Sequence, residues 1–275
     1  MEINNNISQY QSPYIDQNKT LEKIATGLEL NKASNNASAL SIADNLRTQA
    51  NGYAQALQNT NSAIASTQIA DSAIKEQSNI LDNVKEKLLQ ASTDTTSQDA
   101  REAIFKDIQN ALKGFDAIAS ATKYNDQTLL QASQSSQAPS SSQSFQVGTQ
   151  ESDTSNSTSI QSNTLGVGLN DLVTNSPDSF TAEDASDYLS KVDDAIGVLN
   201  NYRAELGSTQ NELASTGRNT ISQEIQTRAA QSELSGANMA QEIATFDKQN
   251  VLSQVGAYTQ SQFNITQQSV MRLLT

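Results

Sequence analysis

Few residues in this chain have the types and spacing that carry out chemistry. Two adjacent carboxylate pairs, Glu183-Asp184 and Asp193-Asp194, could in principle act as acid and base or bind a metal ion. Neighbouring residues on a helix point about 100° apart, so we expect these pairs to face solvent instead. The Gly166-Val167-Gly168 segment lacks the following Gly and the Lys of a phosphate-binding loop. The carboxylates and glycines therefore indicate no phosphate or metal site.

The composition excludes most remaining kinds of catalytic site. The chain has 275 residues and contains no His and no Cys, so an imidazole base, a Ser-His-Asp triad, a thiolate metal site and a disulfide are all excluded. The net charge of −13 argues against nucleic acid or an anionic membrane as partner, because no Lys/Arg stripe is present to neutralise phosphates. No segment approaches the length of a transmembrane helix. We expect no enzyme activity, no cofactor and no metal.

The sequence predicts several long helices. Apolar residues recur at steps of three and four from Ile3 to Leu28, over about 37–91, and from the Thr96 region to near Lys123. After Thr181 the pattern predicts a helix of about 35 residues and then a second helix from about Ile221 to the C-terminus. Such long helices cannot bury an apolar stripe alone, so they must pack against each other or against other copies of the chain.

Local signals mark where these elements begin and turn. Thr96 with Asp99, and Thr181 with Asp184, resemble capping boxes at helix starts. Tyr124-Asn125-Asp126 is a turn signal, and the alternation in Phe145-Gln146-Val147-Gly148 predicts a short strand. The apolar seam of the 37–91 helix is expected to shift by one residue near Gln77.

The middle of the chain, 132–164, is dominated by Ser, Thr and Gln. This composition predicts a flexible surface loop. O-glycosylation of exposed Ser and Thr is the functional alternative for the same segment.

Several motifs of the N-terminal half occur in the order known from one protein family. Ala25 to Ala43 reads ATGLELNKASNNASALSIA and resembles the N-terminal signature of bacterial flagellins. The likeness continues through Asn59 to Ala73, NTNSAIASTQIADSA. The turn at 124–126 and the strand at 145–148 resemble the family's aromatic-Asn-Gly turn and its strand ending in Gln-Val-Gly.

The C-terminal end carries the second half of the resemblance. Residues 250–257, NVLSQVGA, and 267–274, QQSVMRLL, are similar to the C-terminal flagellin helix. Together the likeness covers about residues 21–130 and about residues 189–275. Motifs in the same order at both ends are more specific than any one of them.

The resemblance implies a mainly α fold. The expected architecture is an elongated antiparallel helical bundle or coiled coil with a small β-hairpin region, in which the N- and C-terminal helices pair. Residues 1–37 with 235–275 would form the inner domain of a filament core. Residues 38–234 would form a tube-wall domain of long helices, with a β-hairpin and the Ser/Thr-rich segment at about 132–175.

The resemblance also implies a function. Flagellins are structural subunits that self-assemble as a homopolymer into the bacterial flagellar filament, which serves motility. They are exported without a cleaved signal peptide by the flagellar type III apparatus, and their other partners are an export chaperone and the hook-associated and cap proteins. The expected location is extracellular. The alternative is a flagellin-like secreted protein or a hook–filament junction protein exported by the same apparatus.

The chain departs from the family pattern at several charged positions. Glu29 stands where the family usually has Arg, and Asn35-Asn36 replaces an acidic pair. Near the C-terminus, Glu233 stands where the family has Arg, and two Asp residues are also lost. Because Arg and carboxylates vanish together, we expect neutral contacts to replace the family's charge pairs.

Two sets of residues are candidates for function. Apolar residues at the chain ends are expected to become ordered on self-assembly, since chain ends otherwise fray. They are Ile3, Ile7, Leu21, Ile24, Leu28, Val251, Val255, Ile265, Val270, Leu273 and Leu274. The second set aligns with the helical stretch that a vertebrate immune receptor recognises in flagellins, and its altered charges imply weak recognition. It comprises Asp82, Asn83, Lys85, Glu86 and Lys87.

Overall fold

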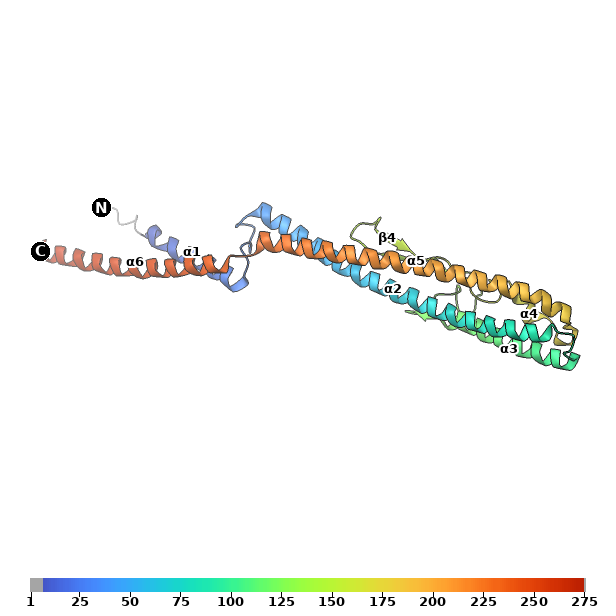
Figure 1. Ribbon diagram of the computed structural model, residues 1–275. Helices are drawn as coiled ribbons and strands as arrows, with labels where there is room; N and C mark the ends of the chain where they lie inside the picture. Colours follow the sequence, from blue (N-terminus) through green and yellow to red (C-terminus); the bar gives the residue numbers. More distant parts are fainter. Residues whose placement is uncertain (1–6, 275) are drawn as a thin grey trace. The chain divides into compact units, whose positions relative to one another are not determined.

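The computed structural model describes residues 7–274, and it consists mainly of helices (Figure 1). Side-chain surroundings are described for these residues except 7–15, 263, 267, 270, 271, 273 and 274. The long helices are α1 (Ile7–Thr26), α2 (Ala37–Ala91), α3 (Gln98–Ala121), α5 (Ala182–Ser235) and α6 (Met239–Leu274). The predicted mainly helical fold is therefore confirmed.

The chain divides into two compact units. One unit combines Met1–Asn51 with Glu224–Thr275, and the other is Gly52–Gln223. In the first unit α1 packs against α6, as the expected pairing of the terminal helices requires. The second unit holds the main apolar core, which lies among α2, α3 and α5.

Packing of α2 follows a seven-residue repeat. Between Ala56 and Ala91, the buried positions of α2 include Ala56, Thr60, Ala63, Thr67, Ala70, Ile74, Gln77, Leu81, Val84, Leu88 and Ala91. Such alternating steps of three and four are typical of helices that pack side by side. The repeat runs through Gln77 without a shift, so the predicted shift there is wrong. Small Ala and Thr side chains carry the seam from Ala56 to Ala70, and a search for large apolar residues misses them.

The core of the second unit is built from large side chains of α2, α3 and α5. Ile74, Phe105, Phe115 and Leu199 are almost completely buried. The ring of Phe105 lies 4.3 Å, between centroids, from the ring of Phe180. Phe180 follows the 3-10 helix η1 (Pro177–Ser179), which itself follows the short helix α4 (Asn170–Thr174). The aromatic contact therefore anchors the segment that leads into α5.

The start of α3 differs by one residue from the predicted cap. Ser97 is the N-cap, and its hydroxyl accepts a hydrogen bond of 3.3 Å from the backbone N–H of Ala100. The Thr96 hydroxyl instead donates to the carbonyl of Gln90 at 2.8 Å. Thr96 thus satisfies a carbonyl at the end of α2, where the helix leaves such groups without intrahelical partners.

Helix α5 begins as predicted and continues further than predicted. The backbone N–H of Thr181 donates to Asp184 at 2.9 Å, and the N–H of Asp184 donates to the Thr181 hydroxyl at 3.1 Å, which completes a capping box. The helix then runs unbroken to Ser235, so the predicted break before Ile221 is wrong. A polar stretch with one Gly is tolerated because the helical backbone bonds continue through it.

Two short antiparallel strand pairs complete the second unit. Strand β1 (Lys123–Tyr124) pairs with β2 (Gln127–Thr128) around the predicted turn. Asn125 and Asp126 both have positive φ, 49° and 62°, which fits the tight turn of a two-residue hairpin. The predicted strand near Phe145 is present as β3 (Ser144–Gln146), which pairs with β4 (Thr154–Asn156).

The Ser/Thr-rich segment is more than a surface loop. Its residues Ser162 and Asn163 are fully buried. The backbone N–H of Thr164 donates to the Asp116 carboxylate at 2.7 Å, and its hydroxyl donates to the same carboxylate at 2.8 Å. The side-chain amide of Gln77 donates to the carbonyl of Ser162 at 3.1 Å. Side chains of α2 and α3 therefore fasten this segment, which composition alone does not reveal.

Candidate assembly surface

Helices α1 and α6 are joined by polar side chains. Going forward along α1 and backward along α6, Gln17 Nε2 donates to Asn250 Oδ1 at 3.0 Å, and the Thr20 hydroxyl donates to Gln249 Oε1 at 3.2 Å. Lys23 Nζ donates to Glu242 Oε1 at 3.4 Å. We call these three pairs, Gln17–Asn250, Thr20–Gln249 and Lys23–Glu242, the polar ladder. The order of the pairs shows that the helices are antiparallel, side by side as in Figure 1.

The side of α6 that is shielded from solvent is mainly polar or small, although it also contains Phe246. Its half-buried residues recur at steps of three and four and include Glu242, Phe246, Gln249, Ser253, Gly256 and Gln260. The ladder partners on α6 belong to the same side of the helix. This side is therefore the one that meets α1.

Most of the exposed apolar side chains of α6 lie on the opposite half of the helix. At about 100° per residue, Val251 lies about 180° around the helix from Glu242. The exposed apolar residues of this half and its edges are Ile243, Val251, Leu252, Val255, Tyr258 and Ile265, and they are 48% to 74% exposed. We call these six residues the apolar face of α6. Exposed apolar side chains gathered on one side of a helix are typical of an interaction site.

Other predicted self-assembly residues have mixed positions. On α1 and just after it, Leu21 and Leu28 are exposed and Ile24 is half-buried. Ile3 lies outside the described residues. Ile7, Val270, Leu273 and Leu274 belong to α1 or α6, but their side chains lie outside the described part.

The segments that leave α1 and α5 are held together by backbone hydrogen bonds. The N–H of Glu29 donates to the Ser235 carbonyl at 2.8 Å, and the N–H of Ala237 donates to the Gly27 carbonyl at 3.0 Å. These bonds flank an antiparallel bridge between Leu28 and Gly236. Gly27 has φ of +70°, a conformation that favours glycine, where the chain leaves α1.

The unusual Glu29 is ion-paired, so the predicted neutral contact is wrong at this position. Lys23 Nζ lies in hydrogen-bond contact with the Glu29 carboxylate and also contacts Glu242. The hydrogen bond to Glu29 raises the pKa of Lys23 above its ordinary value. Neutral contacts are present, as expected, at Asn35 and Asn36. Asn35 donates to the Glu29 carbonyl at 3.0 Å, and Asn36 accepts from the backbone N–H of Ala39 at 3.0 Å.

The stretch aligned with the immune-receptor site lies on α2 and is tied to both neighbouring helices. Asp82, Asn83 and Glu86 are exposed. Lys85 is ion-paired with Asp193 of α5, and Lys87 Nζ lies 3.0 Å from an Asp107 carboxylate oxygen of α3.

The carboxylate pairs that could have suggested chemistry have structural roles. Asp193 pairs with Lys85, and Asp184 caps α5. Hydrogen bonds from Thr181 hold the pKa of Asp184 below its ordinary value. Within the described part of the chain, no group of three or more acidic side chains is placed to hold a metal ion.

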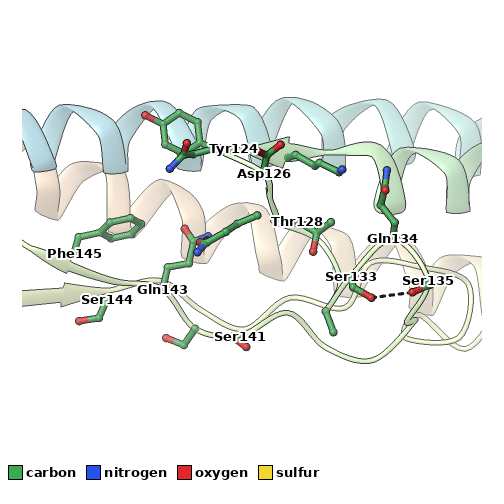
Figure 2. A pocket seen from close by; sticks show the side chains of 15 residues that line it. Tyr124, Asp126, Thr128, Ser133, Gln134, Ser135, Ser141, Gln143, Ser144 and Phe145 are labelled. Atoms are coloured by element: carbon green, nitrogen blue, oxygen red, sulfur yellow. Dashed lines mark hydrogen bonds between the residues drawn. The ribbon is translucent and has the colours of Figure 1, made fainter.

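A polar groove lies beside the β1–β2 hairpin, and Figure 2 shows the side chains that line it. Its volume is about 880 Å³. Gln143 Nε2 donates to Gln127 Oε1 at 3.3 Å, and the hydroxyls of Ser133 and Ser135 are 3.4 Å apart. Amide and hydroxyl groups dominate the lining, and Lys123 and Asp126 are its charged members. This chemistry allows hydrogen bonding but provides no pair of nucleophile and base.

The fold and the paired terminal helices define a helical structural protein with an exposed apolar face. No helix in the described range combines the length and apolar character needed to cross a membrane. Residues 1–135 match the family model of the bacterial flagellin N-terminal helical region, and residues 189–274 match the bacterial flagellin C-terminal helical region. The chain belongs to the bacterial flagellin family. It is a structural subunit of the extracellular flagellar filament and not an enzyme.

Curated relatives agree with this assignment. The flagellin of Bacillus subtilis is 30% identical and the alignment covers 100% of both chains. The flagellar filament 31.3 kDa core protein of Treponema maltophilum is 26% identical, again over 100% of both. Flagellin A of Helicobacter mustelae is 42% identical over 47% of this chain, but that match spans only 25% of the relative.

Solved structures share the fold. The crystal structure of Bacillus cereus flagellin matches with a TM-score of 0.51 and 24% identity, over 59% of this chain and 88% of that one. A candidate flagellar hook-associated protein from Vibrio parahaemolyticus matches with a TM-score of 0.61 and 12% identity, over 74% of this chain and 100% of that one. At these identities the likeness shows the architecture alone.

Proposed function

We propose that this flagellin polymerises by burying the apolar face of α6, together with the apolar ends of the chain, against neighbouring subunits. The observation that carries the proposal is the division of α6 into two sides. The side toward α1 is polar and already in contact, whereas Val251, Val255 and Tyr258 on the other side are exposed. Self-association supplies apolar partners for this surface.

The free energy available from this surface is considerable. Complete burial of an aliphatic side chain contributes about 1.5–3 kcal/mol, so each roughly half-exposed residue contributes on the order of 1 kcal/mol when covered. Summed over the apolar face, the contribution is on the order of 5 kcal/mol per subunit before the loss of translational freedom is counted. Further apolar residues near both chain ends, including Ile3, Ile7, Val270, Leu273 and Leu274, extend the same surface in this proposal.

The proposal includes the two domains and the partners that family membership suggests. Residues 1–37 with 235–275 form the inner domain of the filament core, and 38–234 form the tube wall. The flagellar type III apparatus exports the chain, an export chaperone holds it before export, and hook-associated and cap proteins meet it at the filament ends. Membership of the flagellin family supports these partners.

A double substitution tests the assembly surface. Val251→Ser with Val255→Ser removes apolar side chains that are exposed in the single chain, so the helical content of the free protein should remain unchanged. Filament formation, followed by sedimentation and electron microscopy, should fall at least tenfold in rate or in amount. The control changes Gln241 and Gln254, two exposed residues of α6, to Ser. Filaments formed at the wild-type rate by V251S/V255S would refute the proposal.

A further inference from the structure

The seam between α1 and α6 has a composition that is unusual for a pair of long helices. Thr20 is only 5% exposed, although its side chain is polar. Its hydroxyl lies 3.0 Å from the Asp16 carbonyl oxygen and 3.2 Å from Gln249 Oε1, so its single proton is shared between an acceptor on α1 and one on α6. A polar residue in a helical seam lowers stability relative to an apolar one, but it specifies register and partner.

Only the observed register satisfies all three pairs of the polar ladder. If α6 moved by one heptad so that residues seven positions later faced α1, Thr20 would meet Gly256 and Gln17 would meet Ala257. Neither residue has a side-chain hydrogen-bonding group. A slip in the other direction would place Gln17 against Ile243, which has no side-chain hydrogen-bonding group, and would leave Lys23 beyond the start of α6. Each slip therefore breaks pairs that the observed register makes.

The ladder also disfavours pairing through the wrong side of α6. If α6 rotated to bury Val251 and Val255 against α1, Asn250 and Gln249 would turn away from Gln17 and Thr20, and the observed pairs would be lost. Interactions that are lost in the wrong arrangement are a means of specificity, since discrimination is a difference between two free energies.

We propose that the polar ladder sets the register of α1 against α6 and keeps the apolar face of α6 available for neighbouring subunits. The statement about register depends only on contacts within one chain. The statement about availability rests on the proposed function. Thr20 and Gln249 are positioning residues in this scheme, because they fix which surface the helix pair presents.

A distance measurement between the two helices tests the register. The natural chain has no Cys, so Asn18→Cys and Lys248→Cys, two exposed positions, can be spin-labelled without background. Labelled subunits are diluted into an excess of unlabelled wild-type protein and assembled into filaments. A chain with an intact ladder should give one narrow distance between the labels. A slip by one heptad would displace α6 by about 10 Å along α1.

The informative variant is Thr20→Val with Gln249→Leu, which makes the central pair apolar and removes the hydrogen bond between the two side chains. We expect either a second population of distances at the slipped position, or exclusion of the variant from wild-type filaments while its helical content is unchanged. The matched control, Gln241→Leu with Thr259→Val, makes the same changes at exposed positions of α6 and should give one distance. One unchanged narrow distance for T20V/Q249L, or several distances for the wild-type ladder, would overturn the proposal.

The distance measurement that tests the register is independent of the filament assay that tests the proposed function. Filaments that form normally in V251S/V255S would refute burial of the apolar face but would leave the distance measurement valid. A single distance in T20V/Q249L would refute the role of the ladder in register, whatever V251S/V255S does.

Discussion

Replacement of Arg101 by Met should destabilise the unit Gly52–Gln223 more than replacement of any charged surface residue does. Arg101 is only 9% exposed, and all of its hydrogen-bond partners are neutral oxygens. Its Nε donates to the Ala91 carbonyl at 2.9 Å, and one terminal nitrogen donates to the carbonyls of Thr93 and Thr96 at 3.3 and 3.1 Å. The guanidinium therefore satisfies the last residue of α2 and the turn into α3.

The magnitude follows from what the substitution leaves behind. Met keeps most of the apolar stem, so little cavity forms, but three carbonyls lose a charged donor. Hydrogen bonds to charged groups contribute about 1.5–3 kcal/mol each, and relief from the desolvation of the guanidinium offsets part of the loss. We expect a net loss of about 2–4 kcal/mol for Arg101→Met. Arg101→Lys should lose about half of this, because an ammonium cannot reproduce the planar fork of donors.

Urea unfolding of the free chain, followed by circular dichroism, measures this difference. The matched control is Arg47→Met, since Arg47 is largely exposed and its Asp44 partner, 3.0 Å away, is a surface ion pair. Surface pairs contribute about 0–1 kcal/mol, so the control should change stability little. A loss below about 0.5 kcal/mol for Arg101→Met would show that water replaces the guanidinium without cost and that the hydrogen-bond argument is wrong.

Three further predictions concern the packing and the capping of the same unit. Phe105→Ala should lower the free energy of unfolding by about 3–5 kcal/mol, because it removes a buried ring that packs on Phe180; denaturant titration measures this, and a loss below about 1 kcal/mol would contradict it. Thr181→Ala should cost about 0.5–2 kcal/mol through loss of the cap. Because the pKa of Asp184 is lowered in the folded state, its contribution is present above the unfolded-state pKa and is lost as pH falls through the folded-state pKa. Asp184→Asn should therefore lose less stability than wild type when pH falls from about 5 to about 3 in thermal melts, and equal losses would contradict this.

Local signals in the sequence were sufficient for several elements. The 37–91 helix has the predicted bounds because polar Asn36 caps its start and Ala91 ends its apolar repeat. The turn at 124–126 follows from residues that tolerate positive φ. Backbone preferences of this kind act over a few residues, so they can be predicted without tertiary structure.

Interactions between distant segments could not be predicted in the same way. The apolar pattern predicts that the terminal residues become ordered on self-assembly, but it does not predict that α6 turns a mainly polar side toward α1. The sequence does contain a sign of this mainly polar side, because Glu242, Phe246, Gln249 and Ser253 follow one another at steps of three and four. The partner of Glu29 was also missed, because its ion pair with Lys23 depends on how the chain turns after α1.

The change in side-chain size along α2 has a consequence for its local opening. From Ala56 to Ala70 the buried positions carry Ala, Thr and Ser, whereas from Ile74 to Leu88 they carry mainly Ile, Leu and Val. Each buried methylene contributes about 0.8 kcal/mol, so the same length of helix is held much less strongly at its alanine end. Amide hydrogens near Ala63 should therefore exchange with solvent sooner than those near Leu81, although all belong to one unbroken helix. A single rod-like element thus has one end that opens readily and one that remains closed.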